Sequence, residues 1–471
     1  MPRYLAPGLG LVILTAIPRL AMAQASTEDL VRQGAYIARA ADCMACHTNP
    51  GGKSYGGGYV ISSPLGDIIA TNISPSRQYG IGNWTETQFS RAVREGIAPE
   101  GHLYPAMPYT AYSGISDADI HALYLYFTKG TKPVDLPPER HTALPFPFNQ
   151  RWLMAGWNLL YSTGKPMSAA TTAAGGTQRG EYLVKVLAHC STCHTPRNIG
   201  MSEDQSRFLA GADLGGWHAP NLTSDAISGL GGWSDDELKS YLRDGAAHGK
   251  SQAAGGMAEA VEHSLRHLTD ADLDAIVRYL RTVKPVRNPN QSRPGFSLTT
   301  GKPVDLAVLD APINRSPDAL TNASSINGAE LYTGACASCH QLNGQGTHDQ
   351  FYPSLTSNTA VGGPTAQNLV MAILKGVNRA TNNGTVTMPA FEKQLNDAQV
   401  ASVANYVLQR FGNDAIHVNA ADVTLLKEGG AKPFLVRYAQ IAAIGGVSIM
   451  AVLVFVSLMV IRYKKRNSSK E

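Results

Sequence analysis

All six cysteines of the 471-residue chain lie in three copies of one pattern, Cys-x-x-Cys-His. At this spacing two thiols can form thioethers with the vinyl groups of one porphyrin, while the adjacent imidazole ligates its iron. We therefore predict three covalently bound haem c groups. The predicted attachment cysteines are Cys43, Cys46, Cys190, Cys193, Cys336 and Cys339, and the predicted proximal iron ligands are His47, His194 and His340.

Two other uses of a Cys-x-x-Cys pair are disfavoured. A thioredoxin-like redox pair requires a βαβ context, which is not visible around any of the three copies. A structural zinc ion needs four Cys or His ligands, whereas the motifs lie 147 and 146 residues apart. Because the motifs use every cysteine, no thiol remains for a disulfide or a catalytic nucleophile.

The elements that must position these motifs repeat along the chain. After each of the first two motifs, an Asn, a Trp and a Gly follow one another at intervals of 12 residues. These residues are Asn72, Trp84 and Gly96, then Asn221, Trp233 and Gly245. The capping boxes Thr85-x-x-Gln88 and Ser234-x-x-Glu237 predict the start of a helix in the middle of each of the first two repeats.

The order within each repeat is helix, haem motif, helix, ligand loop, helix. This is the layout of a small all-α cytochrome c domain, so the predicted fold class is all-α, with three tandem cytochrome c domains and one C-terminal transmembrane helix. The predicted segments are domain 1 at 26–165, domain 2 at 177–287, a linker at 288–321 and domain 3 at 322–415.

The sixth iron ligand is expected between the middle and last helices of each repeat. Met107 and Met388 are each followed by a proline, whose fixed φ would hold the thioether in place. Met257 is the corresponding residue of the second repeat but lacks the proline, and His248 and His263 compete with it. Methionine is also a common core residue, which is the alternative reading of all three.

Two apolar segments indicate export and membrane attachment. Residues 1–23 read as a secretory signal ending in Ala21-Met22-Ala23, with cleavage after Ala25 as an alternative. Residues 439–461 are apolar and long enough to cross a bilayer, and the basic tail 462–471 predicts a cytoplasmic C-terminus. We expect a single-pass protein of the bacterial inner membrane with its haem domains in the periplasm. A buried core helix is the alternative for the second segment.

The formal charge of +4 is concentrated at the two ends of the chain. Two of the 40 basic residues lie in the predicted signal and five in the tail, so the region between them is slightly acidic. A nucleic-acid partner therefore has no electrostatic support. No Gly-x-Gly-x-x-Gly follows a predicted strand, so the chain shows no flavin or nicotinamide site of its own.

Together these features resemble the trihaem cytochrome c subunit of bacterial membrane-bound dehydrogenases. The stretches that carry the resemblance are Ala41-Asp42-Cys43-Met44-Ala45-Cys46-His47-Thr48, Ile61-Ser62-Ser63-Pro64-Leu65-Gly66, Thr71-Asn72-Ile73-Ser74-Pro75, Tyr104-Pro105-Ala106-Met107-Pro108-Tyr109 and His189-Cys190-Ser191-Thr192-Cys193-His194-Thr195-Pro196-Arg197. The terminal anchor and residues 256–260 look closest to the flavin-dependent fructose, gluconate and sorbitol branch. The cytochrome subunits of alcohol and aldehyde dehydrogenases are similar enough to remain alternatives.

The resemblance implies two partners. A catalytic subunit, expected to be a flavoprotein, would oxidise a sugar, sugar acid or alcohol, and ubiquinone would receive the electrons from the haems. Six-coordinate His/Met iron has no open position for substrate, which suits electron relay. Two other functions stay open: a stand-alone membrane cytochrome that serves a terminal oxidase, and a haem peroxidase.

Overall fold

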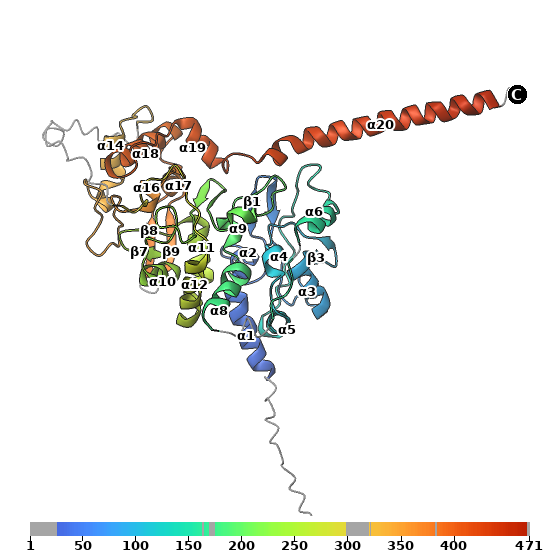
Figure 1. Cartoon of the computed structure of the whole chain (residues 1–471), viewed down its shortest axis with the longest axis horizontal. Coiled ribbons are helices and arrows are strands. Elements are labelled where there is room, and N and C mark those ends of the chain that lie inside the picture. Colours follow the sequence, from blue (N-terminus) through green and yellow to red (C-terminus); the bar gives the residue numbers. More distant parts are fainter. Residues whose placement is uncertain are drawn as a thin grey trace, which may run out of the picture.

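The structure is a computed structural model that describes residues 26–162, 164–168, 175–297, 320, 322–381 and 384–468. The predicted signal, 1–23, lies outside the described residues. Figure 1 shows a body that holds the three repeats in succession, from which one long helix extends.

The first repeat is built on the crossing of its first and last helices. Gly34 lies at this crossing, where a Cβ atom would collide with the backbone carbonyl of Ala122 on the opposite helix. The elements of this repeat are α1 (Thr27–Ala40), α2 (Cys43–His47), β1 (Val60–Ser63), β2 (Gly66–Ile69), α3 (Glu86–Glu95), β3 (Ile97–Ala98), β4 (Gly101–His102), α4 (Tyr109–Tyr112), α5 (Asp117–Leu125), the π-helical η1 (Tyr126–Gly130) and α6 (Leu153–Tyr161).

The second repeat has the same crossing, with Gly180 packed against the carbonyl of Ala275. Its elements are α8 (Gly176–Tyr182), the π-helical η2 (Leu183–Leu187), α9 (Ser191–His194), η3 (Gln205–Arg207), β5 (Ala212–Leu214), β6 (Trp217–Ala219), α10 (Asp235–Asp244), β7 (Ala246–Ala247), β8 (Ser251–Gln252), α11 (Gly255–His263), η4 (Leu265–His267) and α12 (Asp270–Thr282).

In the third repeat, Gly328 packs against the carbonyl of Ser402 where the first and last helices cross. Its elements are α14 (Gly328–Ala335), α15 (Ala337–His340), α16 (Thr359–Gly362), α17 (Gln367–Lys375), β9 (Val377–Thr381), β10 (Gly384–Met388) and α18 (Asp397–Phe411). A further helix, α19 (Ala420–Lys427), packs on α18 and leads to α20 (Phe434–Ser468).

The capping signals in the sequence place the middle helices correctly. Thr85 and Ser234 begin α3 and α10 with complete capping boxes. Gly96 and Gly245 end these helices in the left-handed conformation, at φ 65° and 72°. The local sequence therefore determines both ends of each helix that precedes the predicted ligand segment.

The structure is mostly helical, which confirms the helical cytochrome c domains of the predicted fold class. The described residues also contain five two-stranded antiparallel hairpins, which connect the helices: β1–β2, β3–β4, β5–β6, β7–β8 and β9–β10. Their strands have two to five residues, and the sequence analysis predicted none of them.

The first two repeats share one hydrophobic core. Buried side chains of α1 and α5, such as Ile37 and Leu123, belong to the same cluster as Leu183 of η2 and Ile276 of α12. The third repeat has a core of its own, centred on α17 and α18. The first two repeats are thus one packing unit.

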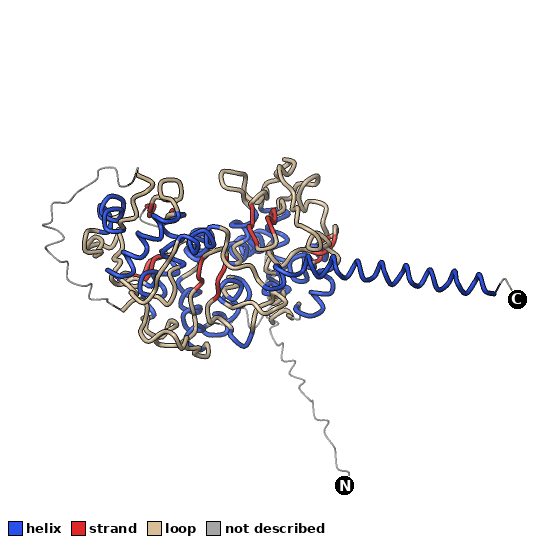
Figure 2. The backbone as a smooth tube through the Cα atoms, turned by 90° about the horizontal axis from the view of Figure 1, so that it is seen from above, coloured by secondary structure: helices blue, strands red, loops and turns tan. Residues whose placement is uncertain are grey.

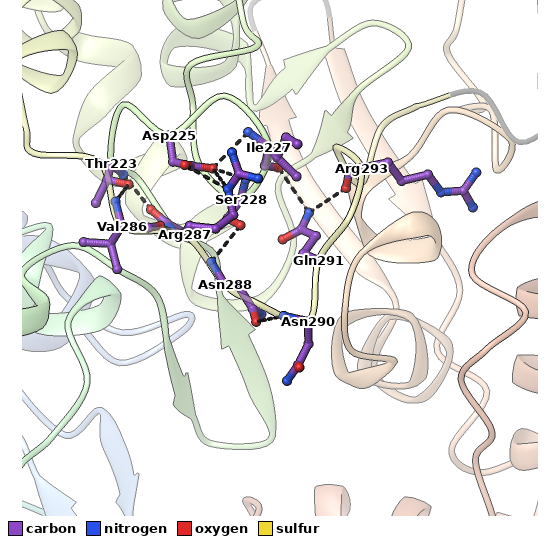
Figure 3. Close-up of polar contacts among 11 residues, drawn as sticks. Thr223, Asp225, Ile227, Ser228, Val286, Arg287, Asn288, Asn290, Gln291 and Arg293 are labelled. Atoms are coloured by element: carbon purple, nitrogen blue, oxygen red, sulfur yellow. Dashed lines mark hydrogen bonds and ion pairs between the residues drawn. The ribbon is translucent and has the colours of Figure 1, made fainter.

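The start of the predicted linker is folded onto the second repeat (Figure 3). The amide of Asn288 donates to the hydroxyl of Ser228, and Gln291 donates to the carbonyls of Ile227 and Arg293. Phe296 then packs edge-on against Trp233. Residues 288–297 therefore extend the second repeat towards the third, while 298–319 and 321 lie outside the described residues.

The predicted anchor, 439–461, lies within the longer helix α20. Its apolar part, Phe434–Arg462, contains an 18-residue stretch with a mean hydropathy of 2.7 that is not buried against the rest of the chain. Figure 2 shows the same helix projecting from the body when the molecule is seen from above. By length and composition it is a candidate membrane span, the only one in the part of the chain that the structure describes.

Candidate haem sites

Each Cys-x-x-Cys-His motif forms a short helical turn directly after the first helix of its repeat. The thiols face the interior, and burial raises the pKa of Cys43, Cys190 and Cys336 to about 12. A protonated, buried thiol is a poor thiolate nucleophile, which agrees with attachment rather than thiol redox chemistry. All six cysteines are free of disulfides.

The three predicted proximal histidines make the same hydrogen bond. Nδ1 lies 2.7 Å from the carbonyl oxygen of Thr71 in His47, 2.6 Å from that of Pro220 in His194, and 2.9 Å from that of Pro353 in His340. A carbonyl oxygen can only accept, so Nδ1 carries the proton and Nε2 has the free lone pair that iron requires.

The imidazoles are neutral where they lie. Burial lowers the pKa of His194 to about 4, and burial also lowers the pKa of His47 and His340. A neutral imidazole with a fixed tautomer is the form that ligates a metal. The donor set therefore fits haem c at all three motifs.

The carbonyls that orient the histidines come from a repeated turn that sequence reasoning did not use. In the first repeat the side chain of Asn72 accepts from the amide of Ser74 and donates to the carbonyl of Val134. Asn221 makes the equivalent bonds, to Thr223 and Val286. Both asparagines thus stabilise a turn through a side-chain bond to the amide two residues on. Their matched spacing was the signal that could have led to the preceding carbonyls.

The predicted distal methionines lie in three different local structures. Met107 lies in the turn before α4 and packs against the core shared by the first two repeats. Met257 is the third residue of α11, not part of an irregular loop, and packs against the same core. Met388 ends β10, where it pairs with Val377.

The alternative ligands of the second repeat are placed differently. His248 is exposed at the turn between β7 and β8, and His263 is the last residue of α11. Met257 packs against the core that surrounds the first two motifs, and His263 is half-buried like Met257.

The first two motifs lie close together. Asp42 and His189, each immediately before the first cysteine of its motif, both have positive φ. Tyr112 donates to the carbonyl of Ala41 beside the first motif, and its ring packs edge-on against His189 beside the second. The two predicted haem sites thus share one wall.

Two reciprocal hydrogen bonds join the first two repeats across this wall. The hydroxyl of Tyr182 donates to Asp119 at 2.7 Å, and the hydroxyl of Tyr36 donates to Asp272 at 2.6 Å. Each tyrosine belongs to the first helix of one repeat, and each aspartate to the last helix of the other. We call these two pairs the tyrosine–aspartate latch.

The latch explains why the aspartates do not close capping boxes. Asp119 and Asp272 occupy the third helical position, where a box would turn the carboxylate back to the N-cap amide. The carboxylates bind residues of the first helices instead, and Gln33 and Arg179 supply the remaining bonds.

Comparison with known proteins assigns the repeats. The Cytochrome c family profile matches residues 178–284 and 325–410, and the profile of cytochrome c oxidase, cbb3-type, subunit III matches 29–127. The fructose dehydrogenase cytochrome subunit of Gluconobacter japonicus is 45% identical over 93% of this chain and 92% of its own length. The chain belongs to the family of cytochrome c subunits of membrane-bound dehydrogenases.

Two further relatives show the breadth of the family. The cytochrome c subunit of alcohol dehydrogenase (quinone) from Komagataeibacter europaeus is 38% identical, over 87% of each chain. The gluconate 2-dehydrogenase cytochrome c subunit of Pantoea cypripedii is 36% identical, over 88% of this chain and 94% of its own length. The resemblance expected from the sequence is confirmed. This dehydrogenase cytochrome subunit serves electron transport, and each matched range contains one haem motif.

Proposed function

We propose that this subunit carries three covalent haem c groups and passes electrons from a catalytic flavoprotein subunit to ubiquinone. The observation that carries the proposal is the common geometry of His47, His194 and His340, each with Nδ1 bonded to a backbone carbonyl. Bound haem supplies one-electron chemistry. The chain attaches the group through two cysteines per motif and fixes the imidazole beside it.

We propose Met107, Met257 and Met388 as the sixth ligands. The shared position of the three methionines, ahead of the last helix of each repeat, supports the assignment, and the exposure of His248 argues against that residue. Substituting each methionine by alanine should remove one of three thioether charge-transfer bands of the oxidised protein and create one CO-reactive haem after reduction. Two bands in the wild-type protein, both retained in Met257→Ala, would transfer the second site to His263 or His248.

We propose that α20 spans the bacterial inner membrane once. The basic residues 462–466 follow its apolar part, so the C-terminus lies in the cytoplasm and the haem domains lie in the periplasm. Protease added to sealed spheroplasts should then digest the haem domains and leave the tail intact. Protection of the haem domains from this protease would reject the orientation.

The catalytic partner is proposed to oxidise a sugar. The relative at 45% identity is named for fructose dehydrogenase, whereas those at 38% and 36% are named for alcohol and gluconate dehydrogenases. The deciding experiment is mass spectrometry of whatever co-purifies with this chain from detergent-solubilised native membranes. A flavoprotein partner supports the proposal, and a quinoprotein or molybdenum partner redirects the substrate to alcohols or aldehydes. Isolation without any dehydrogenase would contradict it and favour a cytochrome that serves an oxidase.

A further inference from the structure

Helix α6 is held to the body by one face. The amide of Asn158 donates to the carbonyl of Glu95, and its oxygen accepts from the hydroxyl of Tyr109. The indole of Trp157 donates to the carbonyl of Gly200 in the second repeat. Residues 154, 157, 158 and 161 form this inner face, and each is at least partly buried.

The opposite face of α6 is apolar and exposed. Trp152, Leu159 and Leu160 are 67%, 83% and 68% exposed, and Leu153, Ala155 and Gly156 complete the face. A solvated surface helix normally presents polar residues outward, so α6 has the reverse pattern. We call Trp152, Leu153, Leu159 and Leu160 the α6 patch.

No described part of the chain covers this patch. Figure 1 shows α6 at the edge of the first repeat, on the side away from α14 and α18 of the third repeat. A contiguous exposed apolar surface rimmed by polar residues marks a contact with another protein or with lipid.

The charges around α6 favour lipid with anionic headgroups. Residues 140–180 contain no Asp or Glu, and Arg151 and Lys165 flank the helix at its two ends. Two carboxylates on adjoining elements already have partners, since Glu95 pairs with Arg91 and Glu203 pairs with Arg197. A short helix with Trp and Leu outward and cations at its ends has the composition of an interfacial membrane helix.

We infer that α6 lies in the membrane surface and forms a second contact of the haem domains with anionic lipid. This inference rests on the proposed membrane span of α20, which begins within seven residues of the end of α19 and so keeps the body close to the bilayer. Because α6 packs on Tyr109, two residues after Met107, the contact would hold the first repeat against the membrane.

The test uses the full-length holoprotein in vesicles of phosphatidylethanolamine and phosphatidylglycerol that contain a phospholipid with a photoreactive acyl chain. After irradiation, mass spectrometry locates the labelled peptides. We expect label in both 152–160 and 434–461. Label in 434–461 alone would overturn the inference while leaving the membrane span intact. Label in neither segment would show that the membrane span itself fails.

A matched pair of variants makes the result specific. The double substitution Leu159→Ser and Leu160→Ser should lower labelling of 152–160 about tenfold, because these side chains supply most of the lipid contact. The control Ile326→Ser changes a residue of similar exposure in the third repeat and should leave that labelling unchanged. Replacing phosphatidylglycerol with phosphatidylcholine should reduce the label in 152–160 but not in 434–461.

A catalytic subunit is the other class of occupant. If it covers α6, the 152–160 segment of the native complex will escape the lipid label, and Lys165 will cross-link to that subunit. This outcome would also overturn the membrane contact.

Discussion

Removing the hydroxyl of Tyr182 should loosen the joint between the first two repeats. Tyr182 is fully buried and donates to Asp119, a buried carboxylate whose other side-chain bond comes from the neutral amide of Gln33. Loss of a hydrogen bond to a charged group costs about 1.5–3 kcal/mol. For a packing unit of this size, about 2 kcal/mol corresponds to a fall in Tm of about 6 °C. Tyr182→Phe should therefore show this fall.

Tyr36→Phe is the matched control, because Tyr36 occupies the equivalent position in the other half of the latch. Its partner Asp272 keeps two bonds from the Arg179 guanidinium, at 2.9 and 2.8 Å. The expected loss is about 1 kcal/mol, or about 3 °C in Tm. Thermal unfolding of the detergent-solubilised holoprotein, followed by circular dichroism, measures the fall in Tm of both variants. A loss for Tyr36→Phe equal to or greater than that for Tyr182→Phe would refute the reasoning.

Three further predictions follow from packing and charge. Gly34→Ala should cost at least about 3 kcal/mol of unfolding free energy, because the added methyl meets a backbone carbonyl of α5. Gly156→Ala, with open space around it, should stabilise by roughly 0.5–1 kcal/mol in the same thermal assay. Arg379→Ala should cost about 3 kcal/mol by leaving a cavity, and Arg379→Met distinctly less, because the buried guanidinium donates to the carbonyl of Ala253 and the amide oxygen of Gln252 rather than to a carboxylate. Equal losses would contradict this. Burial raises the pKa of Asp272, but its bonds with Arg179 outweigh burial and hold that pKa below its ordinary value. The stabilisation is therefore fully present above the ordinary carboxyl pKa of about 4 and is lost as the pH falls through the lower folded pKa, so the Tm difference between wild type and Asp272→Asn should be constant from about pH 5 to 8 and shrink on further acidification.

Local signals were enough to predict the haem motifs, the repeats and the starts of the helices. The capping boxes at Thr85 and Ser234 depend only on residues three positions apart, so they could be read from the sequence. The latch could not, because Tyr36 and Asp272 are 236 residues apart. Tyr36 and Tyr182 occupy equivalent positions in the first helices of their repeats, two residues after Gly34 and Gly180, but nothing local shows that they bind the opposite repeat.

The secondary structure around two of the predicted sixth ligands also could not be predicted from the local sequence. Met107 lies in the expected turn, but Met257 begins a helix because the sequence after it, Ala-Glu-Ala-Val, favours helix over loop. Met388 ends strand β10, which pairs with β9. Arg379 of β9 packs into the second repeat, where its guanidinium donates to the carbonyl of Ala253. The docking of the third repeat therefore shapes this segment, and no signal within the segment itself records that docking.

The first two repeats solve the same packing problem with different parts of the chain. Gly96 and Gly245 end equivalent helices in the left-handed conformation, and each leaves a space where a Cβ would lie. In the first repeat the ring of Tyr109 fills it, 2.6 Å from that Cβ position, and Tyr109 in turn binds α6. In the second repeat the guanidinium of Arg379, from β9 of the third repeat, fills the corresponding space.

The difference between Tyr109 and Arg379 at these equivalent positions shows why the repeats are stacked in one direction only. The face through which the second repeat accepts the third is, on the first repeat, closed by α6. A further repeat therefore cannot dock there in the same way, and the row of repeats ends at α6. The surface that α6 turns outward is apolar where the end of a soluble row should be polar. The outer surface of α6 thus prevents the docking of a further repeat and is apolar, which are the properties required of a surface that lies against a bilayer.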